Sequence, residues 1–279
     1  MQLPKIFIEP DSTVSQFISK YMDYEPASLR DCDFILTSRL KWGTADEHTI
    51  QAALSEPPSY SKTTLFFLVS DSSHEFQIPP NILLFRTSLY RSKKHPNERL
   101  LPYIWEGAPA AFEPLRTTTG KPTVGFCGML SGDRASLIRK LQAVDRIQTS
   151  FIIREKFWGG KPHDPQFIRE FNDNIRNTHF TVCSPGAGNF SMRFYQVLAA
   201  GRVPVVVHHD MEFPYEDEID WDSHLVRGES NEDVIEKLVD FWRTKDLGMV
   251  QTKCRQIYEN YFLPKVFCRR ILEELLTEK

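Results

Sequence analysis

The stretch that decides the fold is FTVCSPGAGNFSMRFYQVLAAGRVPVVV, which runs from Phe180 to Val207. Two short apolar runs frame it, at 178–183, which begins just before the stretch, and at 203–207. Such runs are typical of strands covered on both faces of a parallel sheet. Between them the pattern predicts a glycine-rich turn and then a helix over 191–200, which Gly201 ends. The order strand, turn, helix, strand is the repeating unit of an α/β protein.

The glycine-rich turn favours binding of an anion. Gly186 and Gly188 allow the backbone to approach a ligand closely, and the start of the next helix presents unpaired N–H groups. Ser191 and Arg193 add a hydroxyl and a positive charge on the first turn, and Gln196, one turn later, is in reach of a ribose hydroxyl. The simpler alternative is a tight turn that binds nothing.

Two familiar phosphate motifs are absent from the sequence. It contains no G-x-x-x-x-G-K-[ST] segment, which excludes a P-loop. Ser191 occupies the position of the third glycine of a dinucleotide fingerprint, which disfavours NAD binding.

Working outward, the same alternation appears twice, on either side of a stretch rich in proline, glycine and threonine at 102–122. We expect strands at 5–8, 34–36, 64–70 and 82–85 before that stretch, and at 123–128, 150–153, 178–183 and 203–207 after it. We expect helices at 135–141, 164–175, 191–200, 231–242, 250–261 and 265–276. The predicted domains are therefore 1–118 and 119–262, followed by a terminal helix in 263–279.

Composition limits the classes of function. The chain has 279 residues, of which 41% are hydrophobic and 25% charged, and a net charge of -3, which is typical of a globular protein and argues against a nucleic-acid binder. Five cysteines without a C-x-x-C pair predict neither disulfides nor a cysteine zinc site. No apolar run is long enough to span a membrane. We expect a cytoplasmic protein, in the host cytoplasm if the chain is viral.

The central stretch resembles the signature block of the exostosin-like glycosyltransferases, glycosyltransferase family 47, over roughly residues 120–245. The matching positions are Cys183, Pro185, Gly186, Gly188, Ser191, Arg193, Tyr195, Leu198, Ala200, Gly201, Pro204 and Val205, followed by the runs 213–217 and 219–221. Two positions depart from the family pattern. Gln196 replaces a glutamate, and Gly186 replaces an arginine that often follows the proline.

The resemblance implies a GT-B fold of the α/β class, in which two Rossmann-like domains face a central cleft. It implies an inverting transferase that moves a sugar from a UDP-sugar to a hydroxyl of an oligosaccharide or glycoprotein acceptor, without a metal or other cofactor. UDP-xylose is our first choice of donor, and UDP-galactose and UDP-glucuronate are alternatives. A non-catalytic carbohydrate-binding protein on the same fold is the competing interpretation.

An inverting transferase needs one general base on the acceptor side. Asp71 directly follows the predicted strand at 64–70, and His74 and Glu75 are rivals on the same loop. A carboxylate at that position is also common as a turn residue.

The remaining predicted contacts divide between the two substrates. The predicted donor-binding residues are Gly128, Arg154, Lys156, Gly186, Gly188, Asn189, Ser191, Arg193 and Gln196. The predicted acceptor-binding residues are Trp42, Arg86 and Trp158.

Overall fold

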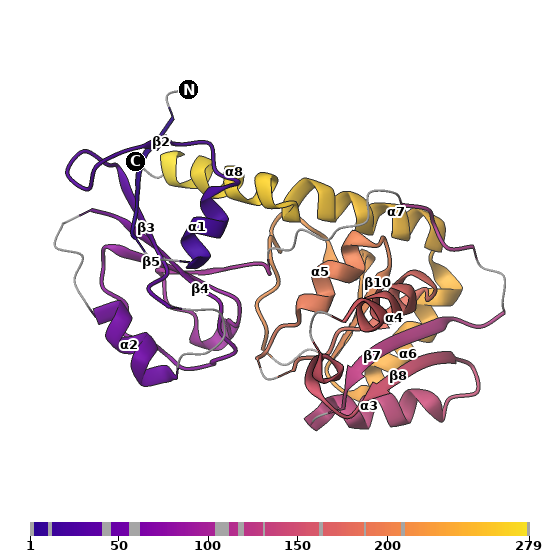
Figure 1. Cartoon of the computed structure of the whole chain (residues 1–279). Coiled ribbons are helices and arrows are strands. Elements are labelled where there is room, and N and C mark those ends of the chain that lie inside the picture. Colours follow the sequence, from indigo (N-terminus) through magenta and orange to yellow (C-terminus); the bar gives the residue numbers. More distant parts are fainter. Residues whose placement is uncertain are drawn as a thin grey trace.

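The fold is taken from a computed structural model of the chain. It describes residues 3–10, 13–40, 46–55, 62–103, 112–116, 120–130, 132–161, 164–186, 188–207 and 210–277. These residues form two α/β domains, each built on one sheet, and the two lie side by side in Figure 1.

The N-terminal domain contains a six-stranded sheet in the order β2-β1-β3-β4-β5-β6, and all its strands are parallel. The strands are β1 (Lys5–Ile8), β2 (Glu25–Pro26), β3 (Phe34–Thr37), β4 (Thr64–Leu68), β5 (Ile82–Arg86) and β6 (Glu98–Leu100). The helices are α1 (Thr13–Ser19) and α2 (Glu47–Ser55), with a 3-10 turn η1 (Arg91–Lys93) after β5.

Both faces of this sheet are covered, which explains the unbroken apolar run in β4. Leu65 and Phe67 pack with α1 in one cluster, whereas Phe66 and Leu68 pack with α2 in another. Because successive side chains of a strand point to opposite faces, a strand between two helical layers needs an apolar residue at every position.

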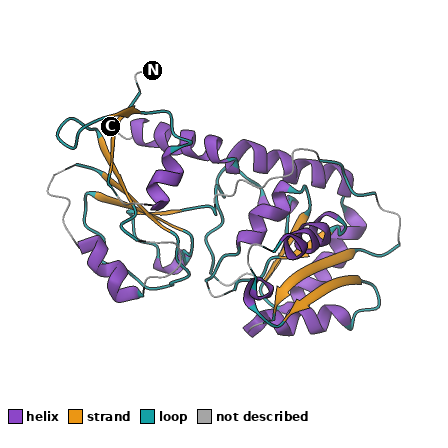
Figure 2. Cartoon of the chain, in the orientation of Figure 1, coloured by secondary structure: helices purple, strands orange, loops and turns teal. Residues whose placement is uncertain are grey.

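The C-terminal domain contains a five-stranded parallel sheet in the order β11-β10-β9-β7-β8. Its strands are β7 (Thr123–Met129), β8 (Gln148–Arg154), β9 (Phe180–Val182), β10 (Val203–Val207) and β11 (Val226–Gly228). Its helices are α3 (Gly132–Gln142), α4 (Pro165–Arg176), α5 (Met192–Ala199), α6 (Asn231–Thr244) and α7 (Leu247–Ile257), with 3-10 turns η2 (Phe157–Gly160) and η3 (Trp221–Ser223). Figure 2 shows helices packed around this sheet.

The last helix, α8 (Pro264–Thr277), returns to the N-terminal domain. A π-helical turn, η4 (Tyr258–Phe262), follows α7 and leads into it. Figure 1 shows α8 extending from the C-terminal domain over the N-terminal one. Its Phe267, Ile271 and Leu275 are buried in the same cluster as α1 and β4, so the end of the chain is part of the N-terminal core.

The predicted α/β class with two domains, each built on a parallel sheet, is confirmed, and each predicted strand and helix overlaps an observed one. The predictions missed β2, β6, β11, α1 and α2, which are short or lack a clear apolar period. The predicted helix at 250–261 begins earlier, at Leu247, and its last turn is the π-helical η4. The predicted domain boundary, between residues 118 and 119, lies outside the described residues.

Two buried histidines make stability depend on pH. Burial lowers the pKa of His179 and of His224 below the ordinary 6.5 of the imidazole. The unfolded chain therefore takes up protons at a higher pH than the folded chain does.

We predict that the free energy of unfolding falls as the pH drops below about 6.5, and is insensitive to these groups above it. Urea unfolding measured between about pH 7.5 and 5.5 checks the direction, because most carboxylates titrate below that range. Replacing both residues (His179→Gln and His224→Gln) should flatten the slope, and the exposed His48→Gln should leave it unchanged. A double variant with the wild-type slope would contradict the assignment.

Candidate functional site

The predicted anion site lies between β9 and α5. Ser191 is the N-cap residue of α5 and has extended backbone angles, but its hydroxyl makes no capping hydrogen bond. The hydroxyl and the first N–H groups of α5 are therefore oriented by the helix and available to a ligand. Gly186, on the preceding turn, is exposed, and a Cβ there would lie 3.3 Å from an Nη atom of Arg134.

Arg193 extends from the first turn of α5 to the carboxyl ends of two strands. Its Nη1 donates to the carbonyl oxygen of Val182 at 3.2 Å, and its Nη2 donates to that of Cys127 at 2.7 Å. Its guanidinium lies 4.6 Å from the centre of the Phe126 ring. A Cβ at Gly128 would come within 2.9 Å of Nη2, so the glycine leaves room for the arginine.

A second arginine, Arg134 on α3, was missed by the sequence analysis. Its guanidinium lies 5.5 Å from the centre of the same Phe126 ring, and its Nη2 donates to the carbonyl oxygen of Ser184 at 2.9 Å. The residue is only 8% exposed. Little in the sequence indicated this role for Arg134, because a single arginine in an amphipathic helix usually lies in solvent.

The two arginines carry charges that no carboxylate balances within the described parts of the chain. Burial lowers the pKa of Arg193 to about 10 and lowers that of Arg134 below its usual value. The Nε atoms of both side chains and the hydroxyl of Ser184 are buried without a hydrogen-bond partner. Arg134 is buried and Arg193 half-buried, and cations withdrawn from water are normally paired, so this cluster has the character of an anion site.

The other predicted donor cations differ from these two. Arg154 at the end of β8 is paired with Glu170 of α4 and lies 4.4 Å from the centre of the Phe167 ring. Its charge is therefore already balanced. Lys156, on the loop after β8, is exposed.

Asn189, which the sequence predicted to contact the donor, bonds across to the N-terminal domain. Its backbone N–H donates to the hydroxyl of Ser88 at 3.0 Å, and its side-chain amide donates to the carbonyl oxygen of Leu89 at 2.7 Å. The Ser88 hydroxyl in turn donates to the Asn189 side-chain oxygen at 2.9 Å. Asn189 is buried, and its polar groups already have partners. It therefore links the turn before α5, which we call the donor turn, to the segment that follows β5.

The same link places Asp71 beside the donor turn. A Cβ at Gly188 would lie 2.9 Å from Asp71 Oδ1 and 3.0 Å from its Cα, so only glycine permits this close approach. Asp71 is exposed, and its Oδ1 accepts a hydrogen bond from the Tyr103 hydroxyl at 3.3 Å. Burial raises the pKa of Tyr103 to about 12, so the phenol keeps its proton and orients the carboxylate at neutral pH.

The two rival base residues lie farther along the loop, and both are exposed. His74 Nδ1 forms an ion pair with Glu47 of α2 at 3.2 Å, so its ring is directed toward the N-terminal domain's own surface. Glu75 has no ion pair within the described residues.

Arg86, which the sequence predicted to contact the acceptor, is buried inside the N-terminal domain. It is 3% exposed, and it forms a buried ion pair with Glu98 at 2.9 Å. Trp42 lies outside the described residues, as does the side chain of Trp158. Gln196 is 8% exposed on α5, and its side chain makes no hydrogen bond to the described residues.

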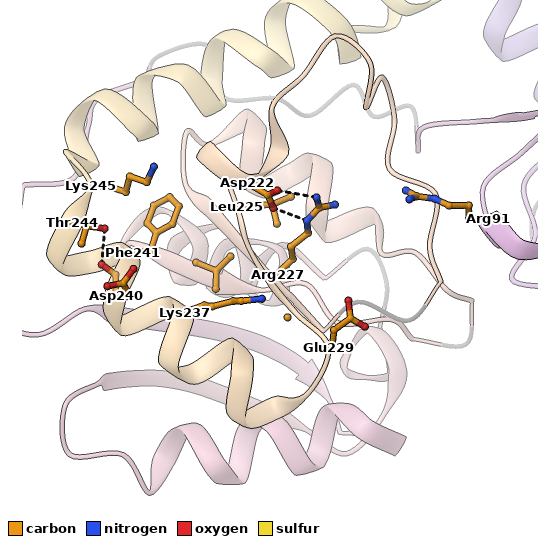
Figure 3. Close-up of a pocket in the computed structure, with 12 residues that line it drawn as sticks. Arg91, Asp222, Leu225, Arg227, Glu229, Lys237, Asp240, Phe241, Thr244 and Lys245 are labelled. Carbon is orange, nitrogen blue, oxygen red and sulfur yellow. Dashed lines mark hydrogen bonds and ion pairs between the residues drawn. The ribbon is translucent and has the colours of Figure 1, made fainter.

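A separate pocket lies beside β11 and α6, at the β11 edge of the C-terminal sheet. Its volume is about 650 Å³, and none of the predicted site residues lines it. Figure 3 shows Arg227 in this pocket bonded to Asp222, and Lys237 also has an acidic partner, Asp233. These lining charges are thus balanced, in contrast to those of Arg134 and Arg193.

The described residues show neither a metal cluster nor a membrane-spanning helix. They contain no group of three or more His, Cys, Asp or Glu residues that could hold a metal ion. No described helix combines the length and apolar character needed to cross a membrane.

Comparison with solved structures finds similar arrangements at low identity. TarM, known from S. aureus, is 9% identical with a TM-score of 0.49, and the match covers 88% of this chain and 54% of TarM. The chain thus spans about half the length of TarM. The DNA-modifying enzyme β-glucosyltransferase is 12% identical with a TM-score of 0.43, and coverage is 97% and 98%. Spinosyn rhamnosyltransferase SpnG is 10% identical with a TM-score of 0.41, and coverage is 86% and 73%.

The curated proteins include no significant match to the sequence. The family comparison, by contrast, matches residues 123–239, which hold β7 to β11, both unbalanced arginines and the turn before α5. The matching family model is described as the exostosin GT47 domain, to which this segment of the chain is similar.

Proposed function

We propose that this protein is a glycosyltransferase that moves a sugar from a UDP-sugar to a hydroxyl of a glycan acceptor, with inversion at the anomeric carbon. The observation that carries the proposal is the pair of unbalanced arginines, Arg134 and Arg193, at the carboxyl ends of β7 and β9. In open α/β sheets, ligands bind at that end of the strands. The GT47 domain match supports the same class of reaction.

A diphosphate supplies the charge that this cluster lacks. Its oxygens would accept from the two guanidinium groups, from the Ser191 hydroxyl and from the first N–H groups of α5. Gln196, one turn further along α5, would contact the ribose. Its amide carries no charge, so we expect it to contribute by hydrogen bonding alone.

The same groups would assist departure of the leaving group. As the bond between the anomeric carbon and the diphosphate breaks, negative charge builds on the diphosphate oxygens. Positively charged groups already fixed in place stabilise that charge more in the transition state than in the ground state.

Asp71 is the proposed general base. In a single displacement the acceptor oxygen bonds to the anomeric carbon as the diphosphate leaves, and the hydroxyl proton passes to a carboxylate. Two observations support this role: Asp71 lies against Gly188, and its carboxylate accepts a hydrogen bond from Tyr103. Glu75 and His74 are exposed on the same loop and remain the alternatives.

The donor sugar is proposed to be xylose, with galactose and glucuronate as alternatives. Incubation with a panel of UDP-sugars, with and without oligosaccharide acceptors, tests both the activity and the choice of donor. Release of UDP identifies a transferase. A non-catalytic carbohydrate-binding protein would release none with any donor.

We predict that Arg193→Met weakens UDP binding by roughly 10- to 100-fold, the loss expected for one charge-assisted hydrogen bond. Methionine keeps an apolar contact with the Phe126 ring, and the variant removes an unbalanced, half-buried charge. The midpoint of thermal unfolding without ligand should therefore be no lower than that of the wild type. Arg134→Met should behave similarly.

Calorimetric titration with UDP gives the affinity, and the exposed Arg146→Met serves as the control, because Arg146 pairs with Glu236 away from the turn. An unchanged affinity in both Arg134 and Arg193 variants would refute the donor site.

We predict that Asp71→Asn lowers kcat by about 10²- to 10⁴-fold, the range for loss of a general base, and leaves the affinity for UDP nearly unchanged. The amide keeps the shape of the carboxyl group but cannot take up the proton. Glu75→Gln is the matched comparison on the same loop. Wild-type turnover in Asp71→Asn together with loss of activity in Glu75→Gln would move the base to Glu75.

We also predict that transfer persists in EDTA, because the arginines supply the positive charge that a divalent cation supplies in other transferases. The check is the initial rate of UDP release before and after dialysis against the chelator. A loss of activity that added Mg²⁺ or Mn²⁺ restores would show that the site needs a metal.

A further inference from the structure

We infer that Arg86 is the positioning residue of the loop at 71–75, which carries all three candidate bases. The inference rests on the proposed function, since it concerns how the N-terminal domain presents its base to the acceptor. It holds whether the base is Asp71, His74 or Glu75, because one arginine holds the backbone they share.

The arginine bonds directly to the backbone of that loop. Its Nη2 donates to the carbonyl oxygen of Ser72 at 2.5 Å, and its Nη1 donates to that of His74 at 2.9 Å. Its guanidinium also lies 5.0 Å from the centre of the Phe76 ring, just past the loop. Arg86 therefore contacts residues on both sides of Glu75 and the residue directly after Asp71.

A buried carboxylate fixes the arginine itself. Glu98, the first residue of β6, is 2% exposed, and its Oε1 accepts from Arg86 Nη1 at 2.9 Å. Its Oε2 accepts from the backbone N–H of His95 at 2.8 Å. Arg86 ends β5 and Glu98 begins the adjacent β6, so both partners are mounted on the sheet.

Stability alone does not account for this pair. Removing two charges from water costs free energy, and well-packed apolar residues of similar volume often serve as well or better. What apolar residues cannot do is donate to two loop carbonyls at once, which the planar fork of arginine does. The pair is therefore best explained by the loop geometry that it imposes.

The start of the loop has a separate attachment. The Thr87 hydroxyl accepts from the Ser70 N–H at 3.1 Å and donates to the Ser70 carbonyl oxygen at 2.9 Å. Asp71 thus lies between one anchor on Thr87 and another on Arg86, the adjacent residue. Both anchors come from the end of β5, the strand whose following segment also binds Asn189 of the donor turn.

The test replaces the ion pair as a unit, with Arg86→Met and Glu98→Leu in one variant, so that no buried charge is left alone. We expect a folded protein that binds UDP with wild-type affinity, because the donor site lies in the other domain. We expect kcat to fall by about 10²-fold, the cost of displacing a reacting group by roughly 1 Å. KM for the UDP-sugar should stay within about twofold, a split that general damage to the fold would not produce.

Two further variants keep the experiment decisive. Arg99→Met with Glu274→Leu removes an ion pair that also involves β6 but lies away from the loop, and it should retain wild-type kcat. If the double variant at 86 and 98 does not fold, Arg86→Lys keeps a positive charge beside Glu98 but lacks the fork, and it should show the same selective loss of kcat.

The possible results separate the two proposals. Wild-type kcat in a folded variant at position 86, or a loss of kcat matched by an equal loss of UDP affinity, would overturn the positioning role. Failure of the wild-type protein to bind UDP or to release it from any UDP-sugar would instead refute the proposed function.

Discussion

The site depends on an electrostatic imbalance at the carboxyl ends of β7 and β9. Arg134 and Arg193 both donate to carbonyl oxygens and both lie near the Phe126 ring. The described residues offer them no carboxylate. Carbonyl dipoles and an aromatic ring stabilise a cation only in part. We propose that a bound anion supplies the remaining stabilisation, and the turn before α5 presents further donors at the same place.

The second constraint is the close contact between the two domains at that turn. Gly188 admits Asp71 at a distance that a Cβ would prevent, and Asn189 bonds to Ser88 and Leu89 beyond β5. The donor turn and the base loop are thereby fixed relative to each other by direct contacts. The α8 helix adds a second connection, since its apolar face completes the N-terminal core. Both connections use residues distant in sequence, so the geometry of this contact follows from the whole fold.

The sequence predicted the parts of this molecule that depend on local pattern. Apolar runs such as β4 and β10 reflect burial directly. The turn before α5 is marked by its closely spaced glycines. Contacts between distant segments were not predictable in this way. Arg86 was predicted to contact the acceptor as part of a basic stretch, and nothing local showed that Glu98 would pair with it. Asn189 was predicted to contact the donor because it lies in the glycine-rich turn, and nothing local showed its bonds to Ser88 and Leu89, which are far away in the sequence.

The most direct test of the central claim is a crystal structure of the protein with UDP. The account predicts that the diphosphate oxygens lie within hydrogen-bonding distance of the guanidinium groups of both Arg134 and Arg193, at the amino end of α5. A diphosphate bound instead in the pocket beside Arg227 and Lys237, with Arg134 and Arg193 still unbalanced, would contradict it.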